Sequence, residues 1–193
     1  MTQTARVPAT EITGVYGGVL KLAMKKMLGQ VPNSAGVMWH HPPVFKDMMG
    51  IGRKTEKWDK VEPNLAAYTV MATAAYVGCS ACLDLNYFMA HHRGLDERKA
   101  REVPRWRESE VFTAVERRAM EYAEAVSQTP PAATDEMVAA LLDDLGAPAL
   151  VELTARIGFM NLAARTNIAL GIRSEQFAEA CGLEPLAQPT VVS

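Results

Sequence analysis

The chain has 193 residues, a mass of 21.1 kDa and a formal net charge of -2, and 49% of its residues are hydrophobic. This length fits one domain over residues 1–193, large enough to bury a core. The near-neutral charge gives no reason to expect a nucleic acid or a membrane surface as a partner. No apolar run approaches the roughly 20 residues that a membrane span requires, and the first residues lack the apolar core of a secretory signal.

The hydrophobic pattern predicts helices, and no segment alternates as a half-buried strand does. In the first half of the chain we expect helices over residues 15–28, 33–39, 44–53, 65–77 and 79–92, and a short basic helix after Asp96. Gly78 separates two of these helices, and Gly94 is a candidate C-terminal cap. The alanines in residues 65–77 permit close helix packing. The apolar helices over residues 65–77 and 150–170 are too apolar for a fully solvated monomer, so they favour assembly into a homo-oligomer.

The second half has the same pattern. Helices are expected over residues 109–129, 135–145 and 148–170, with a short final helix over 174–181. Thr134 is a candidate N-terminal cap, and Pro148 suits the first turn of a helix. The tail after Pro185 is expected to be disordered. The predicted fold class is therefore all-α, a helical bundle with one core.

Two cysteines, Cys79 and Cys82, follow the break at Gly78. Residues three apart at the start of a helix lie on one face, within reach of each other. The partial positive charge of a helix N-terminus favours a thiolate, so this position lowers the pKa of a thiol and makes it more reactive. The pattern therefore favours a dithiol/disulfide centre.

Two other interpretations of the cysteine pair stay open: half of a metal site, and a pair of buried structural cysteines. A structural zinc site normally needs four ligands, but the third cysteine, Cys181, stands alone far downstream. The four histidines form two adjacent pairs, at 40–41 and 91–92, and neighbours on a helix point about 100° apart. We therefore expect no metal site and no cofactor. So few cysteines favour a cytoplasmic protein, where a CxxC is more often catalytic than a permanent cross-link.

The CxxC between two helices resembles the motif of the carboxymuconolactone decarboxylase/AhpD-like (alkylhydroperoxidase) superfamily. The resemblance covers about residues 30–175, and it is supported by softer matches at His41-Pro42, Phe112–Ala119, Leu150–Thr154 and Phe159–Arg165. It implies an AhpD-like all-helical bundle that forms dimers, trimers or hexamers and needs no metal or organic cofactor.

The resemblance also implies a chemistry. Members with AhpD-type activity reduce hydroperoxides through the CxxC, and an external dithiol reductant then restores the pair. Carried over, Cys82 attacks the hydroperoxide and Cys79 resolves the sulfenic acid as a disulfide. Position alone would favour Cys79, which lies nearer the helix N-terminus.

The chain departs from that family pattern at two positions. The family has a histidine four residues after the second cysteine, where this chain has Asn86, and a glutamate twelve residues before the first, where it has Ala67. An amide can donate a hydrogen bond but cannot serve as a base near neutral pH. The sequence therefore predicts a redox pair without its usual proton relay, and a modest rate.

Two neighbours are weaker candidates for the site. Asp84 lies two residues after Cys82, about 200° around the helix, so it faces elsewhere unless the fold brings it back. Tyr76 is close to the glycine break and could donate to a peroxide, although an aromatic residue there is more often part of the core.

Three functions follow from these residues. The first is a thiol-dependent antioxidant enzyme, acting on a hydroperoxide or disulfide substrate. The second is a non-redox enzyme of the lactone decarboxylase type, which would use a general acid or base on a small carboxylated substrate. The third is a catalytically silent oligomeric protein. The paired cysteines favour the first, because the decarboxylase branch does not use a CxxC.

Overall fold

The computed structural model describes residues 5–189, and over this range the chain is helical, with no strand. The helices are α1 (Gly14–Leu28), α2 (Asn33–Met38), α3 (Pro42–Thr55), α4 (Pro63–Val77), α5 (Ser80–His92), α6 (Glu97–Glu102), the 3₁₀ helix η1 (Val103–Arg105), α7 (Ala114–Ser127), α8 (Asp135–Leu145), α9 (Ala147–Leu170) and α10 (Phe177–Ala180). The all-α prediction is confirmed. None of the described helices is long and apolar enough to cross a lipid bilayer.

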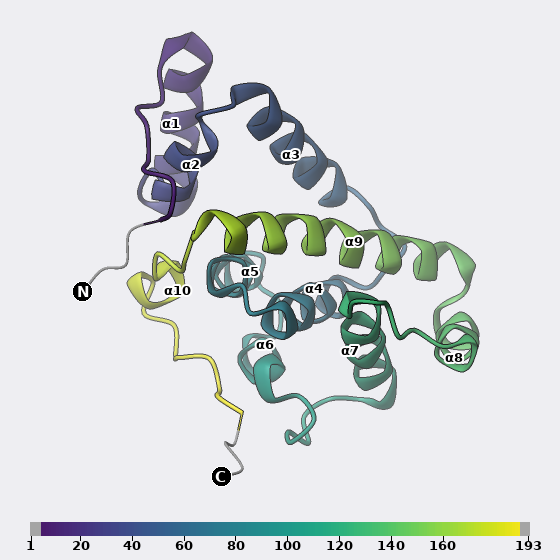
Figure 1. Ribbon diagram of the computed structural model, residues 1–193. Coiled ribbons are helices and arrows are strands. Elements are labelled where there is room, and N and C mark those ends of the chain that lie inside the picture. The colour runs from purple at the N-terminus through teal and green to yellow at the C-terminus, as the bar shows by residue number, and fades with distance from the viewer. Residues whose placement is uncertain (1–4, 190–193) are drawn as a thin grey trace.

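The long helix α9 crosses the molecule, with α1–α3 on one side of it and α4–α7 on the other (Figure 1). Helix α4 is the centre of the second group, because it contacts α5, α7 and α9. Eight of its 15 residues are buried, and its small side chains let the neighbouring helices approach closely. The apolar character of α4 is therefore satisfied within one chain, and it gives no support to an oligomer.

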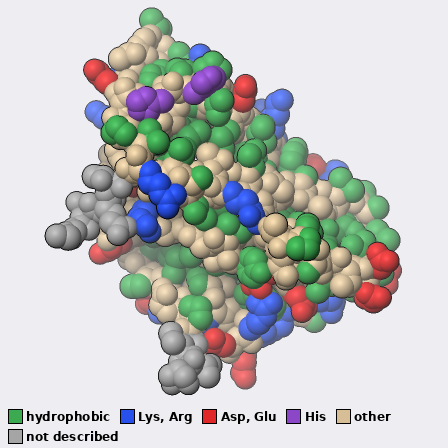
Figure 2. Space-filling view, viewed as in Figure 1, with side chains coloured by type: hydrophobic (Ala, Val, Ile, Leu, Met, Phe, Trp, Pro, Cys, Tyr) green, Lys and Arg blue, Asp and Glu red, His purple; other side chains and the backbone are tan. Residues whose placement is uncertain are grey.

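Helices α1–α3 have a small hydrophobic cluster of their own, formed by Ile12, Met24, Ala35, Trp39 and Phe45. The outer face of α1 is different: Val15, Val19 and Leu22 are 89%, 65% and 71% exposed. Hydrophobic side chains are visible over these N-terminal helices at the top of Figure 2. The exposed apolar surface of the chain thus includes α1, which is neither of the two helices from which an oligomer was predicted.

The segment after α9 folds back on the bundle, where disorder was expected beyond Pro185. Ala187 is 8% exposed, and its backbone N–H donates to the carbonyl of Arg101 over 3.0 Å. Leu186 packs against the core cluster that contains Tyr68 and Tyr87. The expectation of disorder is therefore wrong for residues 186–189, because these apolar side chains have a core to pack on, and residues 190–193 lie outside the described range.

The N-terminal caps of several helices are formed by the residues that the local sequence predicts, but others are not. Asp96 and Thr134 cap α6 and α8 with their side chains, as predicted. Thr113 caps α7, which starts later than expected. Helix α2 has no cap from its own side chains; instead the Glu175 carboxylate accepts the backbone N–H groups of Asn33 and Ser34, over 2.8 and 3.0 Å. A cap that comes from 141 residues away is not visible in the local sequence.

Candidate active site

The two cysteines lie at the junction of α4 and α5. Gly78 ends α4 with a left-handed backbone, φ 83°, which glycine adopts without steric cost. Its N–H and that of Cys79 donate to the carbonyl of Ala74, and α5 begins at Ser80. Cys79 is therefore the N-cap of α5 and Cys82 lies in its first turn, as the sequence predicted.

Cys79 and Cys82 are joined by a disulfide, with their Cα atoms 5.3 Å apart. The backbone N–H of Cys82 donates to the Sγ of Cys79 over 3.2 Å, in the manner of an N-cap. When the pair is reduced, this N–H and the helix N-terminus favour a thiolate on Cys79. The third cysteine, Cys181, is free and exposed, so the two thiols of the CxxC form a unit without it.

The disulfide is buried in an apolar cluster between α4, α5 and α9. Cys79 is 2% exposed and Cys82 is 5% exposed. Their cluster is completed by Ala74, Met160 and Ala164, with partly buried neighbours Val70, Val77, Ala81, Leu83 and Ile168. Such surroundings disfavour a charged thiolate. The few polar contacts to the sulfur atoms therefore decide how readily the thiols ionise.

One of these contacts was not anticipated from the sequence. The Asn167 side-chain amide of α9 donates to the Sγ of Cys82 over 3.4 Å. The spacing of Met160, Ala164 and Asn167, four and three residues apart, puts all three on one face of α9. An amide at this position of an otherwise apolar face was the sequence feature that could have indicated the contact. That the face meets Cys82, 85 residues away, depends on how α9 crosses α5.

The relay position does not carry a base. Asn86 lies one turn after Cys82, and its amide donates to the backbone carbonyl of Cys82 over 2.7 Å, so its side chain is bound to the helix and not to a sulfur. Ala67 lies on α4 and supplies no carboxylate. Neither position therefore supplies a base or a carboxylate to the pair.

Asp84 does not contact the cysteine pair but binds another segment of the chain. It is 7% exposed, and its carboxylate accepts hydrogen bonds from the Ser174 hydroxyl and from the backbone N–H groups of Phe177 and Ala178. These donors belong to the segment after α9. Asp84 is therefore neither solvated nor aimed at the sulfur atoms, and it anchors this segment to α5.

Tyr76 is 47% exposed and lines a cavity of about 260 Å³. The cavity is bounded by α4, η1, Glu124 of α7 and the described end of the chain, Gln188 and Pro189. Leu83 lines this cavity and also packs against the disulfide cluster, so it is a residue that the cavity and the site share. The structure does not bring the Tyr76 side chain into that cluster.

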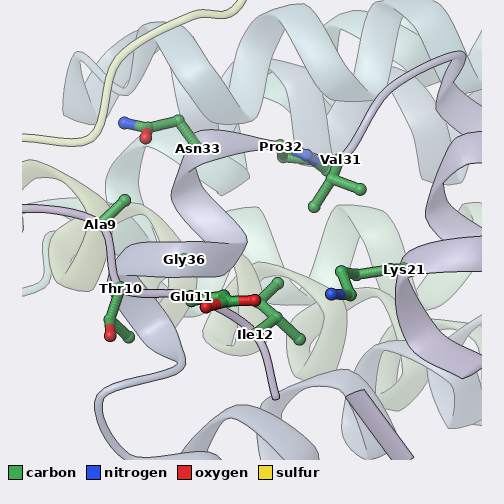
Figure 3. A pocket seen from close by; sticks show the side chains of 9 residues that line it. All are labelled: Ala9, Thr10, Glu11, Ile12, Lys21, Val31, Pro32, Asn33 and Gly36. Atoms are coloured by element: carbon green, nitrogen blue, oxygen red, sulfur yellow. The ribbon is translucent and has the colours of Figure 1, made fainter. Parts of the chain in front are cut away.

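A second cavity lies among the N-terminal helices. It measures about 210 Å³, and its lining comes from residues 9–12, α1, α2 and the turn between them. Glu11 and Lys21 are its charged side chains (Figure 3). None of its lining residues belongs to α4, α5 or α9, so this cavity is separate from the cysteine pair.

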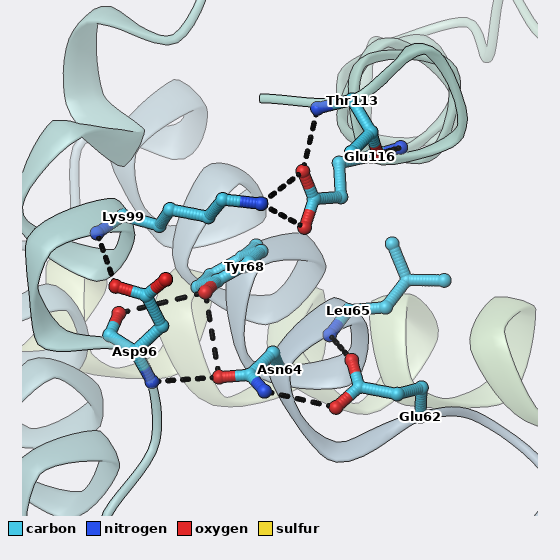
Figure 4. A network of polar contacts seen from close by, with 8 residues as sticks. All are labelled: Glu62, Asn64, Leu65, Tyr68, Asp96, Lys99, Thr113 and Glu116. Atoms are coloured by element: carbon cyan, nitrogen blue, oxygen red, sulfur yellow. Dashed lines mark hydrogen bonds and ion pairs between the residues drawn. The ribbon is translucent and has the colours of Figure 1, made fainter. Parts of the chain in front are cut away.

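A polar network stabilises the opposite end of α4 (Figure 4). The Lys99 ammonium donates to both carboxylate oxygens of Glu116 over 2.9 Å. The Asn64 side-chain oxygen accepts from the Asp96 backbone N–H over 2.8 Å and from the Tyr68 hydroxyl. Burial raises the pKa of Tyr68, with Asp96 and Glu116 adding to the effect. The network joins α4, α6 and α7 and leaves no acid or base directed at the cysteines.

The histidines have local partners. His41 caps α3 by accepting the backbone N–H of Val44, and His91 lies 2.8 Å from a carboxylate oxygen of Glu97. The His92 ring lies 4.1 Å from the ring of Phe88. Within residues 5–189, no three His, Cys, Asp or Glu side chains form a group suited to a metal ion. The absence of a metal site stays a prediction for the protein in solution.

Comparisons with known proteins identify the family. The family model of carboxymuconolactone decarboxylase matches residues 42–125, which include the cysteine pair, α3–α6 and most of α7. An uncharacterized Escherichia coli protein, YnjA, is 35% identical over 127 residues, which are 66% of this chain and 70% of that protein. The chain belongs to the carboxymuconolactone decarboxylase family.

Solved structures of other proteins share the fold. The AhpD core of an uncharacterized peroxidase-related protein from Ralstonia eutropha superposes with a TM-score of 0.79 at 18% identity, covering 92% of this chain and 96% of that one. A variant of the debrominase Bmp8 in complex with 2,3,4-tribromopyrrole gives a TM-score of 0.78 at 20% identity, covering 93% and 96%. At this level of identity the likeness establishes an AhpD-like fold, as expected, and no specific activity.

Proposed function

We propose that this family member is a thiol-dependent oxidoreductase that reduces a hydroperoxide, or a small disulfide, through Cys79 and Cys82. The observation that carries the proposal is the disulfide at the start of α5, in which the backbone N–H of Cys82 reaches the Sγ of Cys79. Two sulfur atoms this close at a helix N-terminus can pass between a dithiol and a disulfide without moving the backbone.

The reaction has three steps. The Cys82 thiolate attacks one peroxide oxygen, so an S–O bond forms, the O–O bond breaks and the alcohol or water leaves with a proton. The Cys79 thiol then attacks the sulfenic acid sulfur, which forms the S–S bond and releases water. An external dithiol finally reduces the disulfide and becomes a disulfide itself. We propose the cytoplasm as the compartment, since dithiol reductants are available there.

The surroundings of the pair support a slow version of this chemistry. Asn86 and Ala67 stand where a relay would need a histidine and a carboxylate, and Asp84 is held by the segment after α9. A proton released by Cys82 must therefore pass to solvent or to the substrate. No specific contact favours a decarboxylase-type reaction at this cluster, because such a reaction needs a positioned acid or base.

The decisive experiment is a titration of free thiols after addition of one equivalent of hydrogen peroxide to the reduced protein. The wild type is expected to lose two thiols and keep Cys181, and a dithiol should restore them. Cys181→Ser is the matched control, expected to lose the same two thiols. In Cys79→Ser, dimedone should label Cys82, whose sulfenic acid can no longer be resolved.

The outcomes separate the alternatives. If both cysteines of the wild type stay reduced under excess peroxide and Cys82→Ser changes nothing, the proposal fails. Dimedone labelling of Cys79 in Cys82→Ser at the wild-type rate would instead make Cys79 the nucleophile. The substrate class is found by comparing hydrogen peroxide, an organic hydroperoxide, a small disulfide and, in view of the debrominase fold, a brominated pyrrole. The substrate is the compound that oxidises the pair fastest.

A further inference from the structure

We infer that Asn167 is a catalytic residue, whose side-chain amide stabilises the thiolate of Cys82 by hydrogen bonding. The inference rests on the proposed function, since it assigns a role at the same sulfur atom. Its starting point is the 3.4 Å contact between the Asn167 Nδ2 and the Cys82 Sγ. A disulfide sulfur carries no hydrogen, so the amide must present its N–H and the sulfur must accept.

The two sulfur atoms are served by different donors. The Sγ of Cys79 accepts the backbone N–H of Cys82, whereas the Sγ of Cys82 accepts the Asn167 amide from α9. Reduction leaves both donors in place and turns each sulfur into a stronger acceptor when it ionises. The N-cap thus favours the Cys79 thiolate, and Asn167 gives Cys82 a donor of its own.

The Asn167 amide stabilises the Cys82 thiolate strongly because the surroundings of the sulfur are apolar. Hydrogen bonds to ionised groups strengthen where water is excluded. The apolar side chains Ala74, Met160 and Ala164, which pack on the pair from α4 and α9, carry no strong hydrogen-bond donor. Asn86, the polar neighbour on α5, directs its amide to a backbone carbonyl. Asn167 therefore compensates in part for the missing relay: it provides a fixed donor to the nucleophile instead of a base.

The charged groups on adjoining elements are engaged elsewhere. On α5, Asp84 is bound to Ser174 and to backbone amides. On α9, Arg165 donates to the carbonyl of Ser127. The guanidinium of Arg6, from the N-terminal segment, binds the carbonyls at the end of α9. Arg173 and, on α4, Tyr76 are exposed. The ionisation of Cys82 is thus governed by its own contacts, the helix N-terminus and Asn167.

The test is the pH profile of alkylation of Cys82 by iodoacetamide in the reduced protein, followed by mass spectrometry. Asn167→Leu removes the donor, and we expect the profile to move to higher pH and the rate at pH 7 to fall about tenfold. Asn167→Asp has the same shape but a negative charge, so it should move the profile further. A role in packing alone predicts the opposite order, with Asp close to the wild type.

Asn161→Leu is the matched control. Asn161 lies on the same helix, and its amide donates to the Ser127 hydroxyl over 2.8 Å instead of to a sulfur, so its loss should leave the alkylation profile in place. If Asn167→Leu does not fold, the near-isosteric Asp variant still decides the question. An unchanged profile in Asn167→Asp would overturn the inference. Failure of the wild-type thiols to react with peroxide would instead overturn the proposed function, because alkylation needs no peroxide.

Discussion

Asp84 of α5 accepts a hydrogen bond of 2.7 Å from the hydroxyl of Ser174, a residue 90 positions later in the chain. The backbone N–H of the same serine donates to Ser80, which lies between the two cysteines, over 3.2 Å. The segment after α9 is thus bound to the turn of α5 that carries the disulfide. Residue Asp84, two positions from Cys82, acts on the site by holding this segment in place.

We therefore expect Asp84→Asn to destabilise the protein, by about 1.5–3 kcal/mol, the usual value of hydrogen bonds to a charged group. In the variant an NH₂ group replaces one of the two acceptor oxygens, so it faces either the Ala178 N–H or the donors of Ser174 and Phe177, and the amides of Phe177 and Ala178 cannot both keep their hydrogen bonds. Urea unfolding measures the loss, and hydrogen exchange should show faster exchange at these two amides. Asp143→Ala, at an exposed position of α8, should change stability by less than about 0.5 kcal/mol. Equal effects of the two variants would contradict the anchoring role.

A second prediction concerns the start of α4, where the Glu62 carboxylate accepts the backbone N–H of Leu65 over 2.8 Å. Burial raises the pKa of Glu62, but hydrogen bonds from Asn64 and Leu65 outweigh it and hold the pKa below the usual 4.5. A carboxyl with a lowered folded-state pKa contributes stability above its unfolded pKa and loses it as the pH falls through the folded value. Glu62 should therefore help stability at pH 7. This contribution should begin to fall near the unfolded pKa, about 4.3, and should be lost once the pH drops below the lower folded-state pKa.

Glu62→Gln keeps an acceptor but cannot titrate, so its free energy of unfolding should fall less steeply between pH 5 and pH 3 than that of the wild type. Glu62→Ala should lose about 1 kcal/mol at pH 7, the usual cost of a missing N-cap. Urea unfolding at several pH values provides both measurements. Parallel curves for the wild type and Glu62→Gln would show that Glu62 has no part in the acid sensitivity.

The residues of the site differ in how far they follow from local sequence. Gly78, Cys79 and Cys82 do, because a left-handed glycine, an N-cap and a first-turn residue are local features. The absence of a base at Asn86 and Ala67 was also visible, by comparison with the family pattern. The partners of Asp84 and Cys82 were not, since Ser174 and Asn167 meet α5 through the path of α9 and the segment after it. Periodicity shows which face of a helix is inward but not which residue it meets.

A homo-oligomer remains a proposal, and the structure changes where its interface is expected. Of the two helices from which the oligomer was predicted, α4 is buried in the bundle, whereas α9 exposes Val151 and Leu162. In addition, Val15, Val19 and Leu22 form an exposed stripe on α1 at helical spacing. We propose that a second copy of this chain covers the stripe. Sedimentation at micromolar concentration should show an oligomer for the wild type and a smaller species for Val19→Glu with Leu22→Glu. Val138→Glu, at a partly exposed position of α8, should sediment as the wild type does, and a monomeric wild type would refute the proposal.

The last prediction restores the relay. Ala67 lies seven residues, about two turns, before Ala74 on α4, so the two residues share a helix face, and Ala74 belongs to the disulfide cluster. Position 86 lies one turn beyond Cys82 on α5. Asn86→His with Ala67→Glu should therefore place a base beside Cys82 and a carboxylate that orients it.

General-base catalysis is typically worth about 10²–10⁴-fold. Because the pocket has not been shaped for the new pair, we expect a gain of at least about tenfold, short of the top of that range. It should be measured as peroxide consumed in the presence of a dithiol, and it should grow as the pH rises through the histidine pKa, about 6.5 when unperturbed. The double variant with glutamine at both positions adds side chains of similar size without a base, so it should show no gain. A glutamine variant as fast as the histidine–glutamate variant would mean that packing, and not proton transfer, limits the rate, and the account of Asn86 as the reason for slow turnover would have to be abandoned.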